Sequence, residues 1–390
     1  MKRTSEDAPI LIYDRIGSNR RKTRWLLAVF VIVSIPVFLF IAHYMTGIVA
    51  MSMFMQAASS PESAVAPIIG ISTGIAVLLL GVAVELLYRY SSRLVLRLTA
   101  ARPLDPKEEP TLVRTVENLC IGAGLPVPQL AIVESRATNI YSTGLEPDKA
   151  TLVVTSGLLE ALDGRELEGV VAQELSQIGN GDVRLGTVLA TVMTIMMLPY
   201  LIGARVIKTL SRANRGRGIG CLFFPVLFFA VMVAGSTVSG LFLISDISDP
   251  TERLFFTLVM LVPLYALIIG PAIAYMLRSA VSREREFLAD ADAVLLTRYP
   301  PGLARALAKI AVPGNAVIAT QPSISHLWIV DPGKPKPTFR TGLFATHPPI
   351  RERIEALSRM GGLTPEMLAA AEADGHLYHD TVAAAARSEN

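Results

Sequence analysis

The chain has 390 residues, of which 52% are hydrophobic and 18% are charged, with a mean hydropathy of +0.48 and a formal net charge of +3. This composition excludes an ordinary soluble protein and predicts an integral membrane protein. The basic residues gather beside apolar stretches, where they indicate membrane topology, so nucleic acid is not expected as a partner. Cys120 and Cys221 lie far apart in the sequence and offer neither a disulfide framework nor a C-x-x-C metal pair.

A hydrophilic leader that ends in the basic run SNRRKTR precedes an apolar stretch from Trp25 to about Met55. This stretch is too long for the apolar core of a cleavable signal peptide, so we interpret it as an uncleaved anchor, although QAASS after it keeps the cleaved alternative open. A second apolar stretch, Ala64 to Val84, is followed by several arginines, whereas the loop between the two stretches contains no Lys or Arg. Positive residues favour the cytoplasmic side, so both flanks and the polar region up to Arg184 are predicted to be cytoplasmic.

Three later apolar stretches are each close to the roughly 20 residues that cross a bilayer: Leu185 to Ala204, Ile219 to Ile244 and Leu254 to Leu277. If all three crossed, the basic loop between Arg205 and Arg217 would face outward, against the positive-inside rule. We therefore expect the last two to form a transmembrane hairpin and the first, which Pro199 interrupts, to be a buried or interfacial helix. The alternative in which the first crosses and one of the later pair does not stays open, because periodicity does not separate the two.

The polar regions predict a small α+β unit. The segment EPTLVRTVENLCIGAGL has the pattern of an amphipathic helix, and QLAIVES and ATLVVTS have the pattern of short strands. After Arg278 the segments SREREFLADADAVLLTR and PPGLARALAKIAV are helical in pattern, and ATHPPIRERIEALSRM opens a further helix after a loop rich in Pro and Gly.

The segment VAQELSQIGNGD, residues 171–182, carries the chemistry of interest. Asp163 and Glu166 have the spacing of a capping box, which predicts that a helix begins just before this segment. On that helix Gln173 and Gln177 lie at i and i+4 on one face with Glu174 beside them, which is the geometry of an H-E-x-x-H zinc motif with glutamine in place of each histidine. Taken alone, the simpler interpretation is a solvated polar face.

Two later segments change that interpretation. Glu286 and Asp290 lie at i and i+4 directly after the predicted hairpin, and His347 stands in the segment T-H-P-P. In this order VAQELSQIGNGD, SREREFLADADAVLLTR and ATHPPIRERIEAL resemble the signature segments of the HtpX-like membrane zinc metallopeptidases, relatives of the CAAX prenyl endopeptidases. The resemblance covers about residues 100–360, includes ATNIYSTG, and implies a mainly α, integral membrane protein whose zincin-like α+β peptidase domain is interrupted by a transmembrane helical hairpin.

The resemblance also implies a role for each position of the site. The two zinc histidines of the family fall on Gln173 and Gln177, its carboxylate zinc ligand falls on Glu286, and its general base falls on Glu174. A carboxamide oxygen is a neutral, hard donor and a poor substitute for imidazole at zinc, so we expect zinc not to be bound and Glu174 to be idle.

Two further positions follow from the same comparison. Asp290 matches an acidic position that orients the ligands, and His347 matches the active-site histidine of the T-H-P-P segment. A metal site rebuilt from His347, Glu286 and Glu174 is the less favoured alternative.

The resulting hypothesis is a pseudopeptidase without a metal cofactor, whose partners are membrane or misfolded polypeptides, an active peptidase or another membrane protein. The alternative is an active membrane metalloendopeptidase that holds zinc through atypical ligands. A channel or transporter is set aside, because the apolar stretches lack internal Lys, Arg and Asp. The expected location is a bacterial inner membrane, with the peptidase-like domain in the cytoplasm.

The sequence predicts seven segments in chain order. The first four are a cytoplasmic basic leader (1–24), two transmembrane helices with a short outer loop (25–97), the first part of the peptidase-like domain (98–184) and a buried or interfacial helix with a basic loop (185–218). The last three are the transmembrane hairpin (219–277), the second part of the peptidase-like domain (278–360) and a C-terminal helical tail (361–390).

Overall fold

The computed structural model describes residues 62–194, 283–312, 323–330 and 347–388, together with a few positions between residues 21 and 32 and Pro250. The chain divides into two compact units. The first contains the sheet and the helices around it and comprises Met1–Leu26, Tyr90–Met193 and Met276–Asn390; the second comprises Leu27–Arg89 and Thr194–Tyr275. The seven segment boundaries expected from the sequence stay predictions.

Helix α2 (Glu62–Leu98) is continuous over 37 residues and includes the predicted apolar stretch 64–84. Within the described part of the chain, no helix meets the combined requirement of length and apolarity for crossing a membrane. The predicted crossings at 219–244 and 254–277 lie outside the described residues. Nearly all of the predicted crossing at 25–55 also lies outside them. Of the stretch 185–204, residues 185–194 are described, and they are helical.

Four strands form one sheet in the order β1-β2-β4-β3: β1 (Arg102–Pro103), β2 (Gln129–Val133), β3 (Ile140–Thr143) and β4 (Thr151–Thr155). Strand β2 runs parallel to β4, whereas β3 is antiparallel to β4 and occupies an edge of the sheet. The two strands predicted around residues 129–135 and 150–156 are confirmed as β2 and β4.

The sheet is buried on both faces. Ile132, Leu152 and Val154 face one hydrophobic cluster, to which helix α5 (Gly164–Asn180) also contributes, while the alternate residues Val133 and Val153 face a second cluster that includes Trp328. Successive side chains of a strand point to opposite faces, so burial of both faces removes the polar alternation that marks a half-exposed strand.

The helices begin and end where local chemistry places their termini. Helix α3 (Pro110–Ala123) has proline in its first turn and ends at Gly124, whose φ of 65° lies in the left-handed region that favours glycine. The helices predicted from the sequence after Arg278 are confirmed as α9 (Arg283–Thr297), α10 (Pro300–Ile310) and α11 (Ile350–Arg359). The remaining helical elements of the described chain are η1 (Pro147–Lys149), α4 (Ser156–Ala161), α5 (Gly164–Asn180), η2 (Ser325–Leu327) and α12 (Pro365–Ser388).

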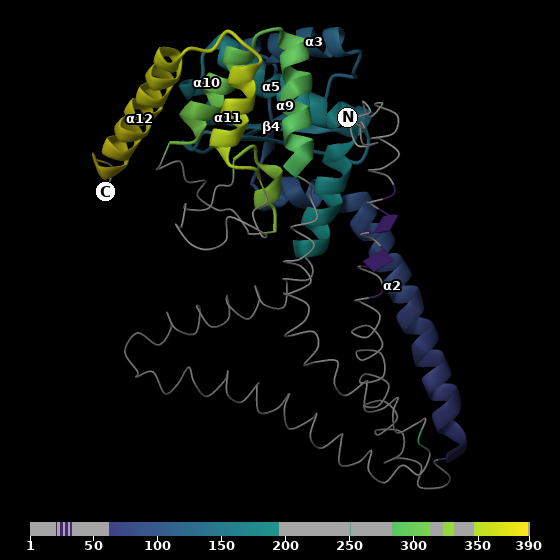
Figure 1. Ribbon diagram of the computed structural model, residues 1–390. Coiled ribbons are helices and arrows are strands. Elements are labelled where there is room, and N and C mark those ends of the chain that lie inside the picture. Colours follow the sequence, from purple (N-terminus) through teal and green to yellow (C-terminus); the bar gives the residue numbers. More distant parts are fainter. Residues whose placement is uncertain are drawn as a thin grey trace, which may run out of the picture. The chain divides into compact units, whose positions relative to one another are not determined.

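Helix α5 lies at the centre of this unit and packs against α3, α9 and α10 (Figure 1). Its contact with α10 is very close, because a Cβ atom on Gly169 would lie 2.6 Å from the backbone nitrogen of Leu303, and one on Gly302 would lie 2.6 Å from the carbonyl oxygen of Arg165. Glycine at both positions is therefore what allows the two backbones to approach.

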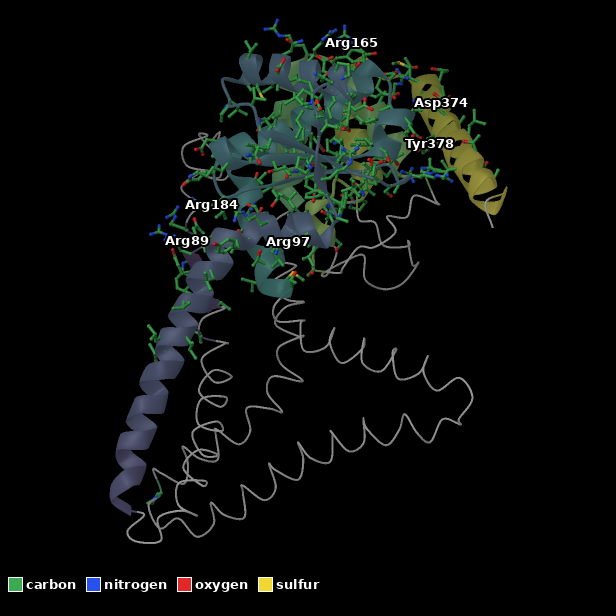
Figure 2. The ribbon with its side chains drawn as sticks, turned by 180° about the vertical axis from the view of Figure 1, so that it is seen from behind. Arg89, Arg97, Arg165, Arg184, Asp374 and Tyr378 are labelled. Carbon is green, nitrogen blue, oxygen red and sulfur yellow. The ribbon has the colours of Figure 1, made fainter. Side chains whose placement is uncertain are left out.

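The C-terminal helix α12 packs on α10. Figure 2 shows Asp374 and Tyr378 on the side of α12 that faces the rest of the unit, where Asp374 lies 3.5 Å from Lys309 Nζ. The Tyr378 hydroxyl lies within hydrogen-bond distance of the carbonyl oxygen of Arg136 (3.2 Å) and of Glu160 Oε2 (3.1 Å). These contacts attach the C-terminal helix to α10, to Glu160 in the helix that follows β4 and to the loop that leads into β3.

Candidate active site

The predicted capping box begins α5. The Asp163 side chain accepts hydrogen bonds from the backbone N–H groups of Arg165 and Glu166, both at 2.9 Å, and Glu166 Oε2 accepts the backbone N–H of Asp163 at 2.9 Å. Glu166 is completely buried and pairs with Lys309 (2.9 Å) and Arg305 (2.8 Å) of α10. The start of α5 is therefore held both by its own cap and by α10. This anchoring positions Gln173, Glu174 and Gln177, which lie further along the same helix.

Glu174 lies on α5 without any exposed surface, and its Oε2 accepts a 2.6 Å hydrogen bond from the hydroxyl of Ser142 on β3. Burial raises the pKa of this carboxyl from 4.5 to about 7. The Ser142 hydroxyl and the positive charges of Arg353 and His347 oppose the shift, while the negative charge of Glu286 adds to it. Glu174 is consequently a carboxyl group that changes its charge near neutral pH.

The two glutamines line one cavity of about 50 Å³ together with Ser142, Glu286 and His347. Gln173 is completely buried, and within the described part of the chain neither its amide nitrogen nor its amide oxygen has a hydrogen-bond partner. Gln177 is half-buried. The expected sharing of one helix face is confirmed, but Gln173 is not part of a solvated surface.

Glu286 on α9 is engaged by two partners through both of its carboxylate oxygens. Oε1 is hydrogen bonded to Nδ1 of His347, and Oε2 accepts a hydrogen bond from Nη1 of Arg353 on α11 at 3.2 Å. The structure thus brings the predicted residues Gln173, Gln177, Glu286 and His347 to one cavity, and it adds Arg353 behind Glu286.

Arg353 also binds Asp290 through two parallel hydrogen bonds, Nε to Oδ2 at 2.8 Å and Nη2 to Oδ1 at 2.6 Å, and it donates to the carbonyl oxygen of Ile329 at 3.1 Å. Both side chains are buried, with Arg353 0% and Asp290 2% exposed. Burial raises the pKa of Asp290, and the guanidinium opposes that rise. Burial by itself would lower the pKa of Arg353, but the carboxylates of Asp290 and Glu286 outweigh burial and hold the pKa above its usual range.

A protein-family model described as peptidase family M48 matches residues 106–361, which contain every residue of this cavity. The chain belongs to peptidase family M48.

Individual M48 relatives agree with this assignment. A protease HtpX homologue of Tropheryma whipplei strain TW08/27 is 37% identical over 275 residues, which cover 70% of this chain and 80% of the relative. One from Dictyoglomus thermophilum is 34% identical over 274 residues, covering 70% and 77%. One from Listeria monocytogenes strain CLIP80459 is 30% identical over 351 residues, covering 90% of this chain and all of the relative.

The donor set of this M48 chain does not fit a zinc ion. Zinc in proteins takes imidazole, thiolate or free carboxylate ligands, whereas the three positions expected to hold zinc carry two carboxamides, Gln173 and Gln177, and a carboxylate, Glu286, that is already paired with His347 and Arg353. Among the described residues, no group of three or more His, Cys, Asp or Glu side chains is arranged to hold a metal ion, and this includes His347, Glu286 and Glu174.

Sequence reasoning missed three residues of this M48 site: Arg353, Ser142 and Arg285. Arg353 has a signal in the sequence, because Arg353 and Leu357 lie at i and i+4 on the buried side of α11. Ser142 lies in a strand whose four residues are all buried, so no alternation distinguishes it. Arg285 lines the cavity and pairs with Asp182 at 3.3 Å, a contact between α9 and the chain just after α5 that no local pattern predicts.

Proposed function

We propose that this M48 protein binds polypeptides at the membrane without zinc-dependent hydrolysis. The observation that carries the proposal is the state of Glu286, whose two carboxylate oxygens bind His347 and Arg353 beside the two carboxamides of the cavity. Gln173 and Gln177 stand, in this proposal, where active relatives have zinc-binding histidines. The protein then acts as a regulator, as an adaptor or by sequestering its clients.

The chemistry of the donor set supports the loss of hydrolysis. An imidazole nitrogen binds zinc at about 2.0–2.1 Å, and a catalytic zinc needs three protein ligands of adequate strength. A metal ion would have to displace both His347 and Arg353 from Glu286 and then bind two neutral amides. Without it, Glu174 has no metal-bound water of lowered pKa to deprotonate, and no Lewis acid polarises a carbonyl group.

The edge of the sheet supports polypeptide binding. Strands β2 and β4 lie inside the sheet, so of the strands between residues 129 and 155 it is β3 that lies at an edge of the sheet in the described part of the chain. On β3, the Ile140 carbonyl oxygen already accepts the backbone N–H of Ile329 at 2.9 Å, and the alternation of an antiparallel ladder turns the backbone of Ser142 toward the same edge. An extended peptide that continues the pairing from Ile329 would meet Ser142 next, beside the cavity.

The membrane setting of the proposal comes from the composition of the chain. The mean hydropathy of +0.48 and the long apolar stretches support an integral membrane protein, with the M48 domain on the cytoplasmic side of a bacterial inner membrane. The proposed clients are membrane or misfolded polypeptides, and an active peptidase or another membrane protein is the proposed regulated partner.

One observation favours a second candidate, an active metalloendopeptidase with atypical ligands. Glu174 is retained with a pKa of about 7, and a general base is most effective when its pKa is close to the working pH. This candidate requires a metal ion in the cavity and cleavage that a chelator stops.

The test measures zinc and proteolysis together. The full chain is purified from membranes in detergent, its zinc content is measured by mass spectrometry of the metal, and its action on casein is followed with and without chelator. We expect no stoichiometric zinc and no cleavage from the wild-type chain, and a gain of both in the double variant Gln173→His/Gln177→His. Adding Glu174→Gln to that variant is the matched control, which should abolish cleavage and leave zinc bound. Stoichiometric zinc with chelator-sensitive cleavage by the wild-type chain would instead establish the second candidate.

A further inference from the structure

Gln173 is an unusual buried side chain. It has no exposed surface, and within the described residues its amide nitrogen and oxygen both lack a hydrogen-bond partner. A buried polar group left without a partner costs about 1–3 kcal/mol, so native proteins rarely retain one. Gln173 lines the cavity described above, so a ligand in that cavity could supply the missing hydrogen-bond partner.

A second donor belongs to the same cavity wall. Trp328 is 1% exposed, and its indole Nε1–H has no hydrogen-bond partner among the described residues. The indole is held in place by Tyr141, whose ring meets it edge-on with centroids 4.5 Å apart, and the Tyr141 hydroxyl lies 2.6 Å from Thr99 Oγ1. Among the described residues, Gln173 and Trp328, which both line the cavity, thus carry two unpartnered donor nitrogens and one unpartnered acceptor oxygen.

Charge on the cavity wall favours a neutral ligand. The carboxylate of Asp182 pairs with Arg285 at 3.3 Å, and that of Glu286 pairs with His347 and Arg353. Each of these two lining carboxylates is thus paired with a cationic side chain. Among the described residues, the wall keeps unpartnered atoms on Gln173, on Trp328 and on Arg285, whose Nη2 has no partner although the guanidinium pairs with Asp182. These atoms suit a ligand that both donates and accepts hydrogen bonds without carrying charge.

A peptide group has this chemistry, since it carries one N–H donor and one carbonyl acceptor. The cavity of about 50 Å³ is several times larger than the roughly 10–15 Å³ that one water molecule needs. Ser142 also lines it, on β3 at an edge of the described sheet, where the proposed function places an extended polypeptide. A main-chain ligand thus fits both the edge and the cavity.

We propose that the cavity binds an uncleaved peptide group of an extended polypeptide, with the Gln173 amide nitrogen donating to its carbonyl oxygen and the Gln173 amide oxygen accepting its N–H. The inference rests on the proposed function and specifies its ligand: the protein recognises main chain, so its clients share an extended conformation and no common side chain. Gln173 is then the residue that holds the peptide group.

Selective labelling gives a direct measurement, because the whole chain has five glutamines: Gln56, Gln129, Gln173, Gln177 and Gln321. Chain labelled with ¹⁵N in the glutamine side chains is titrated with casein in detergent, and the side-chain amide signals are assigned by single substitutions. Binding is measured in parallel by the fluorescence anisotropy of labelled casein. Gln173→Met removes both hydrogen-bonding atoms at similar size, and Gln129→Met changes an exposed glutamine at the start of β2 as the matched control.

We expect casein to shift the amide signals of Gln173 and not those of Gln129. We expect Gln173→Met to weaken casein binding about tenfold, as the loss of two hydrogen bonds predicts, and Gln129→Met to leave it unchanged. Casein binding of equal strength by the Gln173→Met chain, with Gln173 signals that do not move in the wild-type chain, would overturn this inference and leave the proposed polypeptide binding intact. Failure of the wild-type chain to bind casein would overturn both. If Gln173→Met does not fold, the side-chain amide signals of Gln173 in the wild-type chain still test the inference: a shift on addition of casein supports it, and no shift overturns it.

Discussion

At the scale of single residues, the site keeps groups that are costly for stability. Among the described residues, the two polar side-chain atoms of Gln173 have no partner, and Glu174 next to it is a buried carboxyl that accepts a hydrogen bond from the Ser142 hydroxyl. Such groups persist where binding or chemistry needs them, and they leave a measurable signature in the free protein.

The first prediction concerns the stability of the protein without a ligand. Gln173→Met removes two unpaired buried atoms and keeps the volume, so it should raise the free energy of unfolding by about 1–3 kcal/mol. Thermal unfolding in detergent, with Gln129→Met as the exposed control, measures the effect. A lower melting temperature for Gln173→Met than for the control would show that Gln173 is satisfied inside the free chain.

The second prediction concerns pH. Because burial raises the pKa of Glu174 from 4.5 to about 7, its contribution to stability is complete below pH 4.5 and is lost as the pH rises through 7. Glu174→Gln removes this dependence, so the variant should gain stability relative to the wild-type chain between pH 5 and 8 by on the order of 2–3 kcal/mol. Melting temperatures across this range measure the gain, and Glu117→Gln, at an exposed position of α3, is the control. Parallel curves for wild type and Glu174→Gln would contradict the raised pKa.

At the scale of elements, two helices far apart in the sequence, α9 and α11, are joined by one buried guanidinium. Arg353 of α11 connects Asp290 and Glu286 of α9, and Glu286 in turn holds His347, while α5 packs on α9 and presents the glutamines. Breaking a buried ion pair from one side leaves an uncompensated charge, which costs more than the pair itself contributes.

The third prediction follows from that asymmetry. Arg353→Met should destabilise the domain by about 3–5 kcal/mol, because it leaves Asp290 and Glu286 buried without their cation. Arg351→Met on the same helix should change stability by less than about 1 kcal/mol, since Arg351 is exposed and its pair with Glu355 is screened by solvent. Urea unfolding of the two variants measures the contrast. Adding Asp290→Asn to Arg353→Met should recover part of the loss, and equal stability of the two single variants would refute the role of Arg353.

At the scale of the whole molecule, the M48 match runs from residue 106 to 361, and Thr194–Tyr275, which belongs to the second unit, separates two parts of the first unit, Tyr90–Met193 and Met276–Asn390. Both parts contribute to one cavity, because Gln173 comes before that segment and Glu286 comes after it. For the two parts to meet, both ends of the intervening segment must lie on the same side of any membrane that it crosses.

The fourth prediction tests that topology. A fluorescent protein fused after Asn390 should fluoresce and alkaline phosphatase fused there should be inactive, because the C-terminus is expected in the cytoplasm. The same reporters placed after Ser59, in the predicted outer loop, should give the reverse pattern. A C-terminus that activates alkaline phosphatase would require a different number of crossings.

Many of the helices and strands were predicted from local sequence patterns. The capping box of Asp163 and Glu166, the helix that follows it, strands β2 and β4 and helices α3, α9, α10 and α11 were predicted because caps and hydrophobic periodicity act over a few residues. Strand β1 was missed, because two residues with exposed side chains leave no periodic signal. Arg353, Ser142 and Arg285 were missed, because their partners lie on other elements.

The sequence by itself determined the apolar character of the chain, the order of its three motif segments and the placing of Gln173, Glu174 and Gln177 together on one helix, since helical spacing makes neighbours of residues three and four apart. Only the tertiary structure decided that Glu286 is already bound by His347 and Arg353 and that the buried Gln173 amide has no partner in the part of the chain that the structure describes. The reason is physical: a hydrogen bond between helices depends on how close packing places side chains that are far apart along the chain, and no local pattern contains that distance.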